Sequence, residues 1–449
     1  MGKLFGTDGI RGVVNETLDG KLAFRIGQAA AISLAAGKTG KPVVVVGMDT
    51  RISSDMLENA LIAGLCTCGA DVVRLGVIPT PAVAYLTVYL HADAGVVISA
   101  SHNPYEHNGI KIFSGEGFKL NDELEENIES LILQEGELPC KTFAGLGQVR
   151  DGKPYFAPYL DHLASTVGEL SGLRVAVDCA NGAASATAKA LFSRFDLDVT
   201  YLNDAPTGVN INVDCGSTHL GMLSDFVKKG GYDLGLAFDG DADRCLAVDE
   251  NGCEVDGDRI MAICATYLTA QGKLPGAGFV ATVMSNLGLH RFAEEEHLRL
   301  LCAPVGDRNV LELMQKEKMA LGGEQSGHII FLEHTTTGDG QLTALQFLSI
   351  VLASGKKVSA LAAMVRSYPQ ILVNVPGPHD NTEKKALIET QSLQTLIRKI
   401  EQELAGEGRI LVRPSGMEAL IRVMAEASTE ENAKKAAMAV AEAVENLQK

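Results

Sequence analysis

Residues 43–76 read VVVVGMDTRISSDMLENALIAGLCTCGADVVRLG, and this stretch decides the fold. It begins with four consecutive valines (residues 43–46), a continuous β-branched run typical of a strand buried on both faces. After a polar loop, leucines recur at the spacing of one helical stripe: Leu57, Leu61 and Leu65. A second short strand follows over residues 72–76. The order strand, loop, helix, strand predicts an α/β unit with parallel strands.

The same order recurs twice further along the chain, beginning near Arg174 and near Phe279. Each of the three units is followed by two further strands that are separated by a polar loop. These strand pairs are expected at residues 95–99 with 109–113, 235–239 with 245–249, and 319–323 with 329–332. Because α/β sheets bind ligands at the carboxyl ends of their strands, the three polar loops are the expected places for chemistry.

The end of the chain follows another pattern. A linker after Tyr368 leads to a turn at Pro376, then a helix, two strands that enclose residues 414–419, and a last helix that Ser428 and Glu431 would cap. We therefore expect an α/β protein of four domains: three successive α/β domains of shared topology, with mixed sheets between helices, and a smaller α+β C-terminal domain. The expected domains are residues 1–153, 154–254, 255–369 and 370–449.

The overall composition excludes several classes of partner. A net charge of −17 over 449 residues argues against a nucleic acid or an anionic membrane surface as a partner. No apolar run approaches the roughly 18–20 residues that a membrane-spanning helix needs. The nine cysteines are scattered, and the spacing of Cys66 and Cys68 matches no zinc or redox motif. These features predict a reduced, cytoplasmic protein.

The second polar loop, DGDADR, places Asp239, Asp241 and Asp243 at every second position. An extended segment would aim all three carboxylates the same way, and they would repel one another unless a hard cation such as Mg²⁺ or Ca²⁺ joined them. An EF-hand loop is excluded because Arg244 occupies the required glycine position and strands flank the loop. An acidic turn without an ion is the alternative to a metal site.

The first polar loop, SASHNP, contains Ser99, Ser101, His102 and Asn103. Serine and asparagine in a turn often bond only their own backbone. The loop nevertheless lies at the same strand end as the predicted cation, and Mg²⁺ commonly takes a phosphate oxygen as a ligand. A phosphorylated Ser101 would supply that oxygen, and a covalent serine phosphate splits phosphoryl transfer into two easier steps.

Two further segments carry polar side chains suited to a phosphorylated sugar. GGEQSGH contains Glu324, Ser326 and His328, and a carboxylate with a hydroxyl can read vicinal sugar hydroxyls. RPSGMEALIR has two arginines around a Ser-Gly turn, which suits bidentate binding of a phosphate: Arg413, Ser415, Gly416 and Arg422. Surface arginines beside a hairpin are the alternative. FGTDGIRG, with Arg11, and GMDTRISS are weak evidence by themselves.

Taken together, these segments resemble the α-D-phosphohexomutase family over essentially the whole chain. The matching motifs are FGTDGIRG (residues 5–12), GMDTRISS (47–54), VVISASHNPYEHNGIKIF (96–113), NINVDCGSTH (210–219), DGDADRC (239–245), TVMSNLGL (282–289), GGEQSGH (322–328) and RPSGMEALIRVM (413–424). The family has four domains, of which the first three share one α/β topology, and this agrees with the repeats.

The resemblance implies a role for each motif residue. Ser101 would carry the phosphoryl group, and the three aspartates with a serine phosphate oxygen would bind Mg²⁺. Acid–base and charge-stabilising work is implied for Arg11, Lys111 and His328. Support of the phosphoserine is implied for His102, Asn103 and Arg244. Contacts to sugar hydroxyls are implied for Glu324 and Ser326. A grip on the phosphate that is not being transferred is implied for Arg413, Ser415, Gly416 and Arg422.

The implied reaction interconverts glucosamine 6-phosphate and glucosamine 1-phosphate through glucosamine 1,6-bisphosphate, in amino-sugar nucleotide synthesis for cell-wall precursors. Gln325 favours the glucosamine branch of the family. The alternatives are a member acting on glucose or mannose phosphates, a phosphatase, and a non-catalytic phosphosugar-binding protein. Met417 and Ala419 depart from the family's usual threonine and proline in the phosphate loop. The resemblance also suggests a homodimer.

Overall fold

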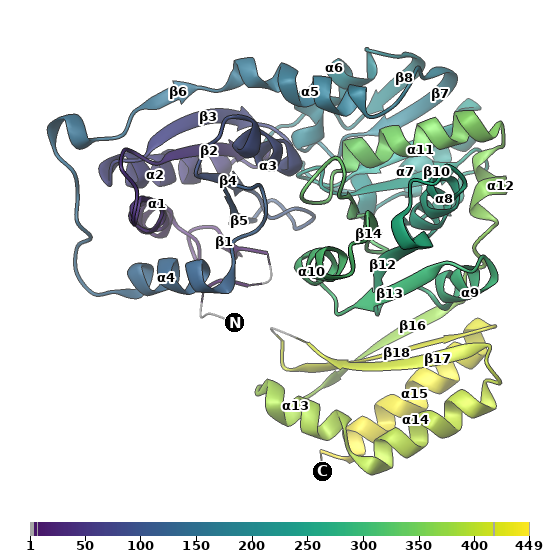
Figure 1. Ribbon diagram of the computed structural model, residues 1–449. Coiled ribbons are helices and arrows are strands. Elements are labelled where there is room, and N and C mark those ends of the chain that lie inside the picture. Colours follow the sequence, from purple (N-terminus) through teal and green to yellow (C-terminus); the bar gives the residue numbers. More distant parts are fainter. Residues whose placement is uncertain (1–3, 7, 416–417, 449) are drawn as a thin grey trace. The chain divides into compact units, whose positions relative to one another are not determined.

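The computed structural model describes residues 4–6, 8–415 and 418–448. The chain divides into two compact units (Figure 1). Unit 1 comprises Met1–Met284 and Arg299–Met364, and unit 2 comprises Ser285–Leu298 and Val365–Lys449. No helix in the described ranges combines the length and the apolar character that crossing a bilayer requires.

The first sheet of unit 1 has the strand order β1-β5-β4-β2-β3-β6. Its strands are β1 (Ile10–Val13), β2 (Val43–Met48), β3 (Asp71–Val77), β4 (Ala94–Ile98), β5 (His107–Ser114) and β6 (Val149–Asp151). Its helices are α1 (Gly20–Ala35), α2 (Ser54–Thr67), α3 (Thr80–Tyr89) and α4 (Asp122–Leu133). The strand, helix and strand predicted within residues 43–76 are therefore confirmed as β2, α2 and β3.

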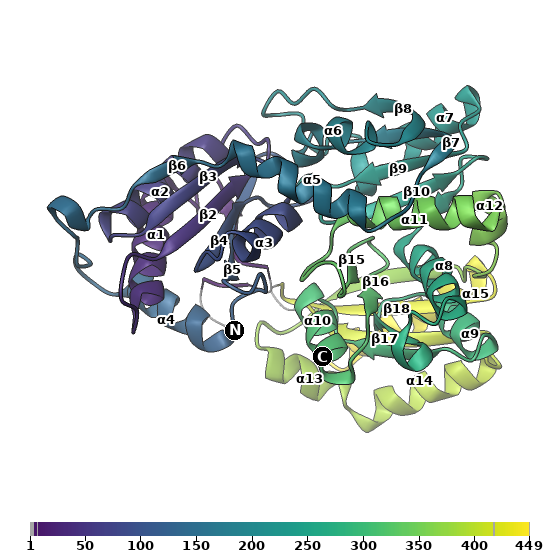
Figure 2. The same ribbon diagram turned by 45° about the horizontal axis from the view of Figure 1, so that its top comes forward.

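The four valines of β2 explain why this strand is central, because they supply apolar side chains to both faces of the sheet. Val44 and Val46 pack into a buried core with side chains of α1 and α2. On the opposite face, a Cβ atom at Gly47 would lie 2.6 Å from Val83 of α3, so this helix packs directly on the strand. Helices thus cover both faces (Figure 2), which is why the run is apolar without alternation.

The second and third sheets repeat the arrangement of the first. The second sheet, β11-β10-β9-β7-β8, contains β7 (Ser171–Asp178), β8 (Asp196–Leu202), β9 (Leu234–Phe238), β10 (Cys245–Asp249) and β11 (Glu254–Val255). The third sheet, β13-β12-β14-β15, contains β12 (Gly278–Thr282), β13 (Arg299–Ala303), β14 (Leu321–Gly323) and β15 (Ile329–Phe331).

Four strands of each sheet share one order, namely β3-β2-β4-β5, β8-β7-β9-β10 and β13-β12-β14-β15. In each case the first three strands are parallel and the last is antiparallel. The predicted shared topology with mixed sheets is therefore confirmed. The three polar loops, after β4, β9 and β14, occupy equivalent places in the three sheets.

The remaining helices of unit 1 accompany the second and third sheets. They are α5 (Phe156–Ser165), α6 (Ala188–Phe192), α7 (Gly221–Gly230), α8 (Gly257–Ala270), α10 (Asp307–Glu317), α11 (Gly340–Ser354) and α12 (Val358–Ala362). Helix α9 (Leu287–Glu295) lies in the chain between β12 and β13 but belongs to unit 2.

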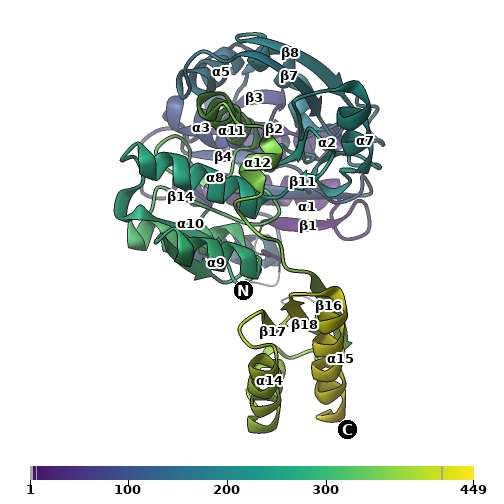
Figure 3. The ribbon, with the colours of Figure 1, turned by 90° about the vertical axis from the view of Figure 1, so that its right-hand side faces the viewer.

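Unit 2 contains an antiparallel sheet of order β16-β18-β17. Its strands are β16 (Gln370–Pro376), β17 (Gly408–Pro414) and β18 (Leu420–Ala427), and its other helices are α13 (Asn381–Ile388), α14 (Gln391–Glu403) and α15 (Glu430–Asn446). Helices α14 and α15 lie on the same side of this sheet (Figure 3), so the predicted α+β architecture of this part is confirmed.

Two local expectations for unit 2 are wrong. The linker after Tyr368 is the strand β16, and the last helix is capped by Thr429, whose side chain accepts from the Asn432 N–H. Ser428, which we expected as the cap, is instead the residue after β18. The threonine hydroxyl serves the same purpose as a serine hydroxyl, one residue later.

Candidate active site

The loop after β9 contains the three alternating aspartates. Asp239, Asp241 and Asp243 are all buried, and one carboxylate oxygen from each lies within 4.8 Å of the others. The expectation that this segment is extended is wrong. Residues 239–244 form a turn, with Ala242 at a φ of 55°, and the turn brings the carboxylates together.

Two oxygens of this triad point to a cation. Within the described part of the chain, no hydrogen-bond donor reaches Oδ1 of Asp241 or Oδ1 of Asp243. Burial and the two neighbouring carboxylates raise the pKa of Asp239 well above its ordinary value. Buried carboxylates with free oxygens are costly unless a cation pairs with them, and oxygen ligands suit a hard divalent ion. The triad therefore has the composition and spacing to hold a metal ion.

The other oxygen of Asp241 is held from two directions. Lys111 Nζ on β5 lies 2.9 Å from Asp241 Oδ2, and Thr80 Oγ1 at the start of α3 donates to the same oxygen at 2.6 Å. Burial opposes the charge of Lys111, but Asp241, Asp8 and Asp243 outweigh it and raise the pKa of this ammonium. Lys111 is therefore a buried cation beside the triad.

Ser101 lies at the edge of the triad, in the loop after β4. Its hydroxyl donates to Asp239 Oδ2 at 2.6 Å, and His102 Nδ1 lies 3.3 Å from the same hydroxyl. Ser101 is 1% exposed and has a φ of 52°, in the left-handed region that non-glycine residues rarely occupy. Burial and the nearby cations Arg244 and Arg11 lower the pKa of His102 to about 4. His102 is thus a neutral ring beside the serine.

Arg11 belongs to a network of charges that surrounds Lys111. Asp8 forms ion pairs with Arg11, with Lys111 at 3.1 Å and with Lys119 at 2.6 Å. Although burial acts in the opposite direction, these three cations hold the pKa of Asp8 well below its ordinary value. Lys119 also pairs with Asp307 at 2.6 Å. The FGTDGIRG segment, weak evidence by itself, therefore supplies both an anion and a cation to the site.

His328 lies in the loop after β14 and reaches the same network. Its Nδ1 is 3.6 Å from Asp243 Oδ2, and its Nε2 is 3.7 Å from Asp307 Oδ2. Burial lowers the basicity of the ring, but these carboxylates outweigh burial and raise the pKa of His328 to about 9. The Gly338 N–H, which points at Nε2 from 3.0 Å, favours the neutral ring; the two carboxylates carry full charges and exert the stronger effect.

The other two residues expected to support the phosphoserine, Arg244 and Asn103, make different kinds of contact. Arg244 Nε lies 4.0 Å from Asp239 and 3.8 Å from Asp243. Burial opposes its charge, but these carboxylates raise the pKa of Arg244. Asn103 contributes its carbonyl, which accepts from Arg51 and Asn212. Arg244 thus approaches the triad with its side chain, whereas the contacts of Asn103 described here are made by its backbone carbonyl.

The loop after β14, which we expect to contact the sugar, is partly held in place. Glu324 Oε1 accepts from the Gly306 N–H at 3.2 Å, and Ser326 is half-buried. Gln325, the residue that favoured the glucosamine branch, donates to Asp256 Oδ2 at 3.1 Å. Gln325 therefore ties this loop to the N-cap of α8, while Glu324 and Ser326 remain the residues expected to contact sugar hydroxyls.

Unit 2 carries a cluster of its own at the predicted phosphate loop. Arg413 and Arg422 lie opposite each other on β17 and β18, and no hydrogen-bond acceptor among the described residues contacts either Nε atom. Burial and the neighbouring Arg422 lower the pKa of Arg413. Ser415 Oγ donates to Glu418 at 3.2 Å. Gly416 and Met417 lie outside the described residues.

Several residues that contact the predicted site residues were not identified from the sequence. Lys384 is 1% exposed and donates to the carbonyls of Ser415 and Glu418, so it ties together the two ends of the predicted phosphate loop. Thr80 and Lys384 gave no signal in the sequence. Arg51 and Asn212 lie inside motifs that we had quoted, and their polar side chains were the available clue.

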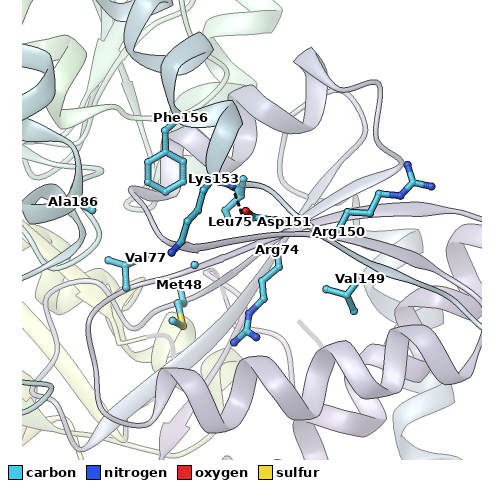
Figure 4. Close-up of a pocket in the computed structure, with 11 residues that line it drawn as sticks. Met48, Arg74, Leu75, Val77, Val149, Arg150, Asp151, Lys153, Phe156 and Ala186 are labelled. Atoms are coloured by element: carbon cyan, nitrogen blue, oxygen red, sulfur yellow. Dashed lines mark hydrogen bonds between the residues drawn. The ribbon is translucent and has the colours of Figure 1, made fainter.

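A separate cavity of about 750 Å³ opens beside β3, where β6 ends. Figure 4 shows apolar side chains around it, including Met48, Val77 and Phe156, together with Lys153. None of the predicted site residues lines this cavity. This cavity is therefore separate from the predicted site residues in the loops after β4, β9 and β14.

The sequence matches four family models along nearly all of its length. These describe the phosphoglucomutase/phosphomannomutase α/β/α domains I, II and III at residues 2–138, 157–252 and 256–368, and the C-terminal domain at residues 372–443. The chain belongs to the phosphoglucomutase/phosphomannomutase family. The resemblance noted from the motifs is thereby confirmed.

Curated members of the phosphoglucomutase/phosphomannomutase family are similar to this chain over their full length. The phosphoglucosamine mutase of Acetivibrio thermocellus is 52% identical over 447 residues and 99% of each chain. That of Anoxybacillus flavithermus is 54% identical over 433 residues and 96% of each chain. The aligned region covers nearly all of both chains in each case.

Solved structures of the family share the fold. A phosphoglucomutase/phosphomannomutase family protein from Burkholderia thailandensis superposes with a TM-score of 0.79 at 24% identity, covering 98% of this chain and 97% of that one. The N-acetylphosphoglucosamine mutase of Aspergillus fumigatus, in complex with GlcNAc-6P and magnesium, gives 0.69 at 19% identity over 99% and 96%. These likenesses confirm the four-domain α/β architecture of the family.

Proposed function

We propose that this protein is an isomerase that interconverts glucosamine 6-phosphate and glucosamine 1-phosphate through a phosphoserine and glucosamine 1,6-bisphosphate. The observation that carries the proposal is the hydrogen bond from Ser101 Oγ to Asp239, 2.6 Å long, at the edge of the buried aspartate triad. The names of curated relatives at 52% and 54% identity support the choice of sugar. The reaction supplies amino-sugar nucleotide synthesis for cell-wall precursors.

The reaction consists of two phosphoryl transfers of opposite direction. In the first, the bond between phosphorus and Ser101 Oγ breaks, a bond from phosphorus to a sugar hydroxyl oxygen forms, and a basic group of the protein takes the hydroxyl proton. The sugar then holds two phosphates. In the second, the other phosphoryl group moves from the sugar to Ser101 Oγ, and the released sugar oxygen takes a proton. The phosphoserine is regenerated, so no net phosphate is consumed.

The residues around Ser101 have charges suited to this chemistry. Phosphoryl transfer depends mainly on positioning and on neutralising negative charge. Lys111, Arg11 and Arg244 supply positive charge around the triad and the serine loop. His328 lies 3.6 Å from Asp243, and its raised pKa, about 9, leaves the ring protonated near neutral pH and able to donate a proton. Magnesium fits the triad: Asp239, Asp241 and Asp243 would hold it, and it would neutralise charge on the phosphoryl oxygens.

The remaining proposals concern contacts to the sugar and to its second phosphate, the cellular location and the oligomeric state. Glu324 and Ser326 would contact sugar hydroxyls, and Arg413, Ser415, Gly416 and Arg422 would bind a phosphate. Nine free cysteines suit a reducing compartment, which supports a cytoplasmic location. The four domain boundaries and the homodimer also stay predictions. Light scattering of the purified protein measures its molar mass and so tests whether it is a dimer.

A steady-state comparison of substrates tests the proposed function. Purified protein with Mg²⁺ and a catalytic amount of glucosamine 1,6-bisphosphate should convert glucosamine 6-phosphate with a higher kcat/KM than glucose or mannose phosphates. Preference for glucose or mannose phosphates would overturn the choice of sugar. Release of inorganic phosphate without mutase product would indicate a phosphatase, and binding without either product would indicate a phosphosugar-binding protein.

A further inference from the structure

The GMDTRISS segment contains an arginine, Arg51, whose guanidinium is buried and donates hydrogen bonds from all three nitrogens. Arg51 Nε donates to Asp49 Oδ2 at 2.9 Å, and neither side chain is exposed. Its two terminal nitrogens donate to three backbone carbonyls of the loop after β4: Ser101 at 2.9 Å, Asn103 at 2.8 Å and Pro104 at 2.5 Å. One planar guanidinium therefore holds three backbone carbonyls of the serine loop.

Asp49 holds the same loop from its other side. Asp49 Oδ2 accepts from Ser99 Oγ at 2.7 Å, and Ser99 Oγ in turn accepts from the Ser101 N–H at 2.9 Å. The Ser101 N–H is thus linked to Asp49 through one hydroxyl, while the Ser101 carbonyl is bound directly by Arg51. A single buried ion pair restrains the backbone on both sides of the serine Cα atom.

This restraint explains how Ser101 keeps an unusual conformation. Its φ of 52° is one that residues with a Cβ atom ordinarily avoid, and such strain persists only where the surroundings over-determine it. The Nδ2 of Asn212 adds a further donor to the Ser101 carbonyl at 2.9 Å. With its backbone held this way, Ser101 directs its hydroxyl at Asp239.

We propose that Asp49 and Arg51 form a positioning pair that keeps Ser101 in its left-handed conformation, so that the serine oxygen occupies one place in both phosphoryl transfers. The proposal rests on the proposed function. Because the sugar must present two different oxygens to one phosphoserine, a serine that stays fixed reduces the search to movement of the sugar. Neither residue of the pair contacts the carboxylates of the triad, so its action is exerted through the loop.

The chain offers a matched control in Arg25. This arginine also donates to backbone carbonyls, at the end of α4, where it binds Ile132, Gly136, Leu131 and Gln134. It performs the same local task at a segment that contains none of the predicted site residues. Arg25→Lys therefore measures the cost of losing a carbonyl-binding guanidinium without touching the serine loop.

The test compares Arg51→Lys with Arg25→Lys in the full-length protein. Lysine keeps the charge opposite Asp49 but cannot reach three carbonyls with a planar fork. We expect kcat of Arg51→Lys to fall about 10- to 100-fold, the effect of one or two lost charge-assisted hydrogen bonds, with KM within about twofold of wild type. Arg25→Lys should change neither constant. Wild-type kcat in Arg51→Lys, or a change confined to KM, would overturn the proposal.

Hydrogen exchange of residues 97–106, measured by mass spectrometry, gives a readout that needs no substrate. The amides of this segment should exchange at least tenfold faster in Arg51→Lys than in wild type, and should not change in Arg25→Lys. Faster exchange in Arg51→Lys, combined with a wild-type protein that isomerises no sugar phosphate, would overturn the proposed function but keep the restraint. Unchanged exchange in an active enzyme would sink the positioning pair alone. Ser99→Ala, which removes the link from Asp49 to the Ser101 N–H, should give a smaller loss of kcat in the same direction.

Discussion

At the scale of single residues, the site is a set of buried charges that depend on one another. Asp8, Lys111 and Lys119 are linked by ion pairs, and Lys111 also binds Asp241. A change at any one of them leaves the remaining buried charges with one partner fewer, which is costly. Ser101 is different because its hydroxyl is neutral, so it can be removed without stranding a charge. Its replacement therefore isolates its chemical role.

Ser101→Ala should lower mutase turnover by several orders of magnitude, because the oxygen that carries the phosphoryl group is absent. Intact mass spectrometry after incubation with glucosamine 1,6-bisphosphate should show one added phosphoryl group on wild type and none on the variant. Ser193→Ala, at an exposed helix end, is the control and should keep both properties. Wild-type turnover in Ser101→Ala would exclude the phosphoserine mechanism.

Asp339 predicts a pH-dependent contribution to stability. It caps α11 and accepts from Tyr159 Oη at 2.8 Å. Burial raises the pKa of Asp339 to about 6. The folded protein therefore binds this proton more tightly than the unfolded chain, whose carboxyl has an ordinary pKa near 4. The stabilisation is complete below the unfolded pKa and is lost as the pH rises through the folded pKa, by roughly 3 kcal/mol in total.

Asp339→Asn keeps a good capping residue but cannot ionise. The free energy of unfolding of the variant relative to wild type should therefore rise by roughly 3 kcal/mol between about pH 4 and 7, as measured by urea denaturation. Asp380→Asn, at the exposed N-cap of α13, is the control. A difference between Asp339→Asn and wild type that does not vary over this pH range would contradict the assignment.

At the scale of elements, the sequence predicted most of what is regular. The valines of β2 and the helical leucines that follow them are local patterns, so periodicity was enough to find the three repeats. Strand β16 was missed because Asn374 and Pro376 interrupt its apolar character. It lies at the edge of its sheet, where a proline and exposed polar residues are tolerated.

The parts of the site that the sequence could not predict come from contacts between distant residues. Thr80 and Asp241 are 161 positions apart, and nothing around Thr80 distinguishes it from any threonine at a helix start. The three aspartates were found, but by an argument from extended geometry that the turn at Ala242 contradicts. Spacing indicates which residues act together, whereas the backbone that unites them follows from tertiary packing.

Thr80, at the start of α3, contacts Asp241 in the loop after β9, and this contact gives a prediction about α3. It binds Asp241 twice, through Oγ1 at 2.6 Å and through its N–H to the Asp241 carbonyl at 2.9 Å. Thr80→Val removes the first contact and should weaken Mg²⁺ binding about 10- to 100-fold, as for other residues that orient metal ligands. Isothermal titration calorimetry provides the measurement.

Thr87→Val is the matched control for Thr80→Val. Thr87 lies in the same helix and is fully buried, and its hydroxyl donates to the Val83 carbonyl at 2.7 Å. It should lose some stability and no metal affinity. Equal Mg²⁺ affinities in the two variants would show that the contact with Asp241 does not orient the ligand.

At the scale of the whole molecule, the two units should respond differently to loss of metal. The acidic triad belongs to unit 1, and the described residues of unit 2 contain no comparable group. A ligand that binds only the folded state stabilises the part that binds it. Chelation should abolish activity and lower the unfolding temperature of unit 1, and excess Mg²⁺ should restore both. Full turnover in metal-free protein would exclude the predicted metal site.

Helix α9 has a consequence for how the chain is made. It is encoded between two strands of unit 1, yet its start is secured by unit 2: Asn286 Nδ2 and the Leu287 N–H both donate to the buried carboxylate of Glu426. At Gly288, a Cβ atom would lie only 1.7 Å from the Arg366 carbonyl. Asn286 precedes Glu426 by 140 residues, so at roughly 5–20 residues per second the helix is synthesised roughly 7–28 seconds before its partner strand. Unit 2 therefore cannot fold to completion as an independent C-terminal domain. A gene fragment beginning after residue 364 would lack residues Ser285–Leu298, which belong to this unit.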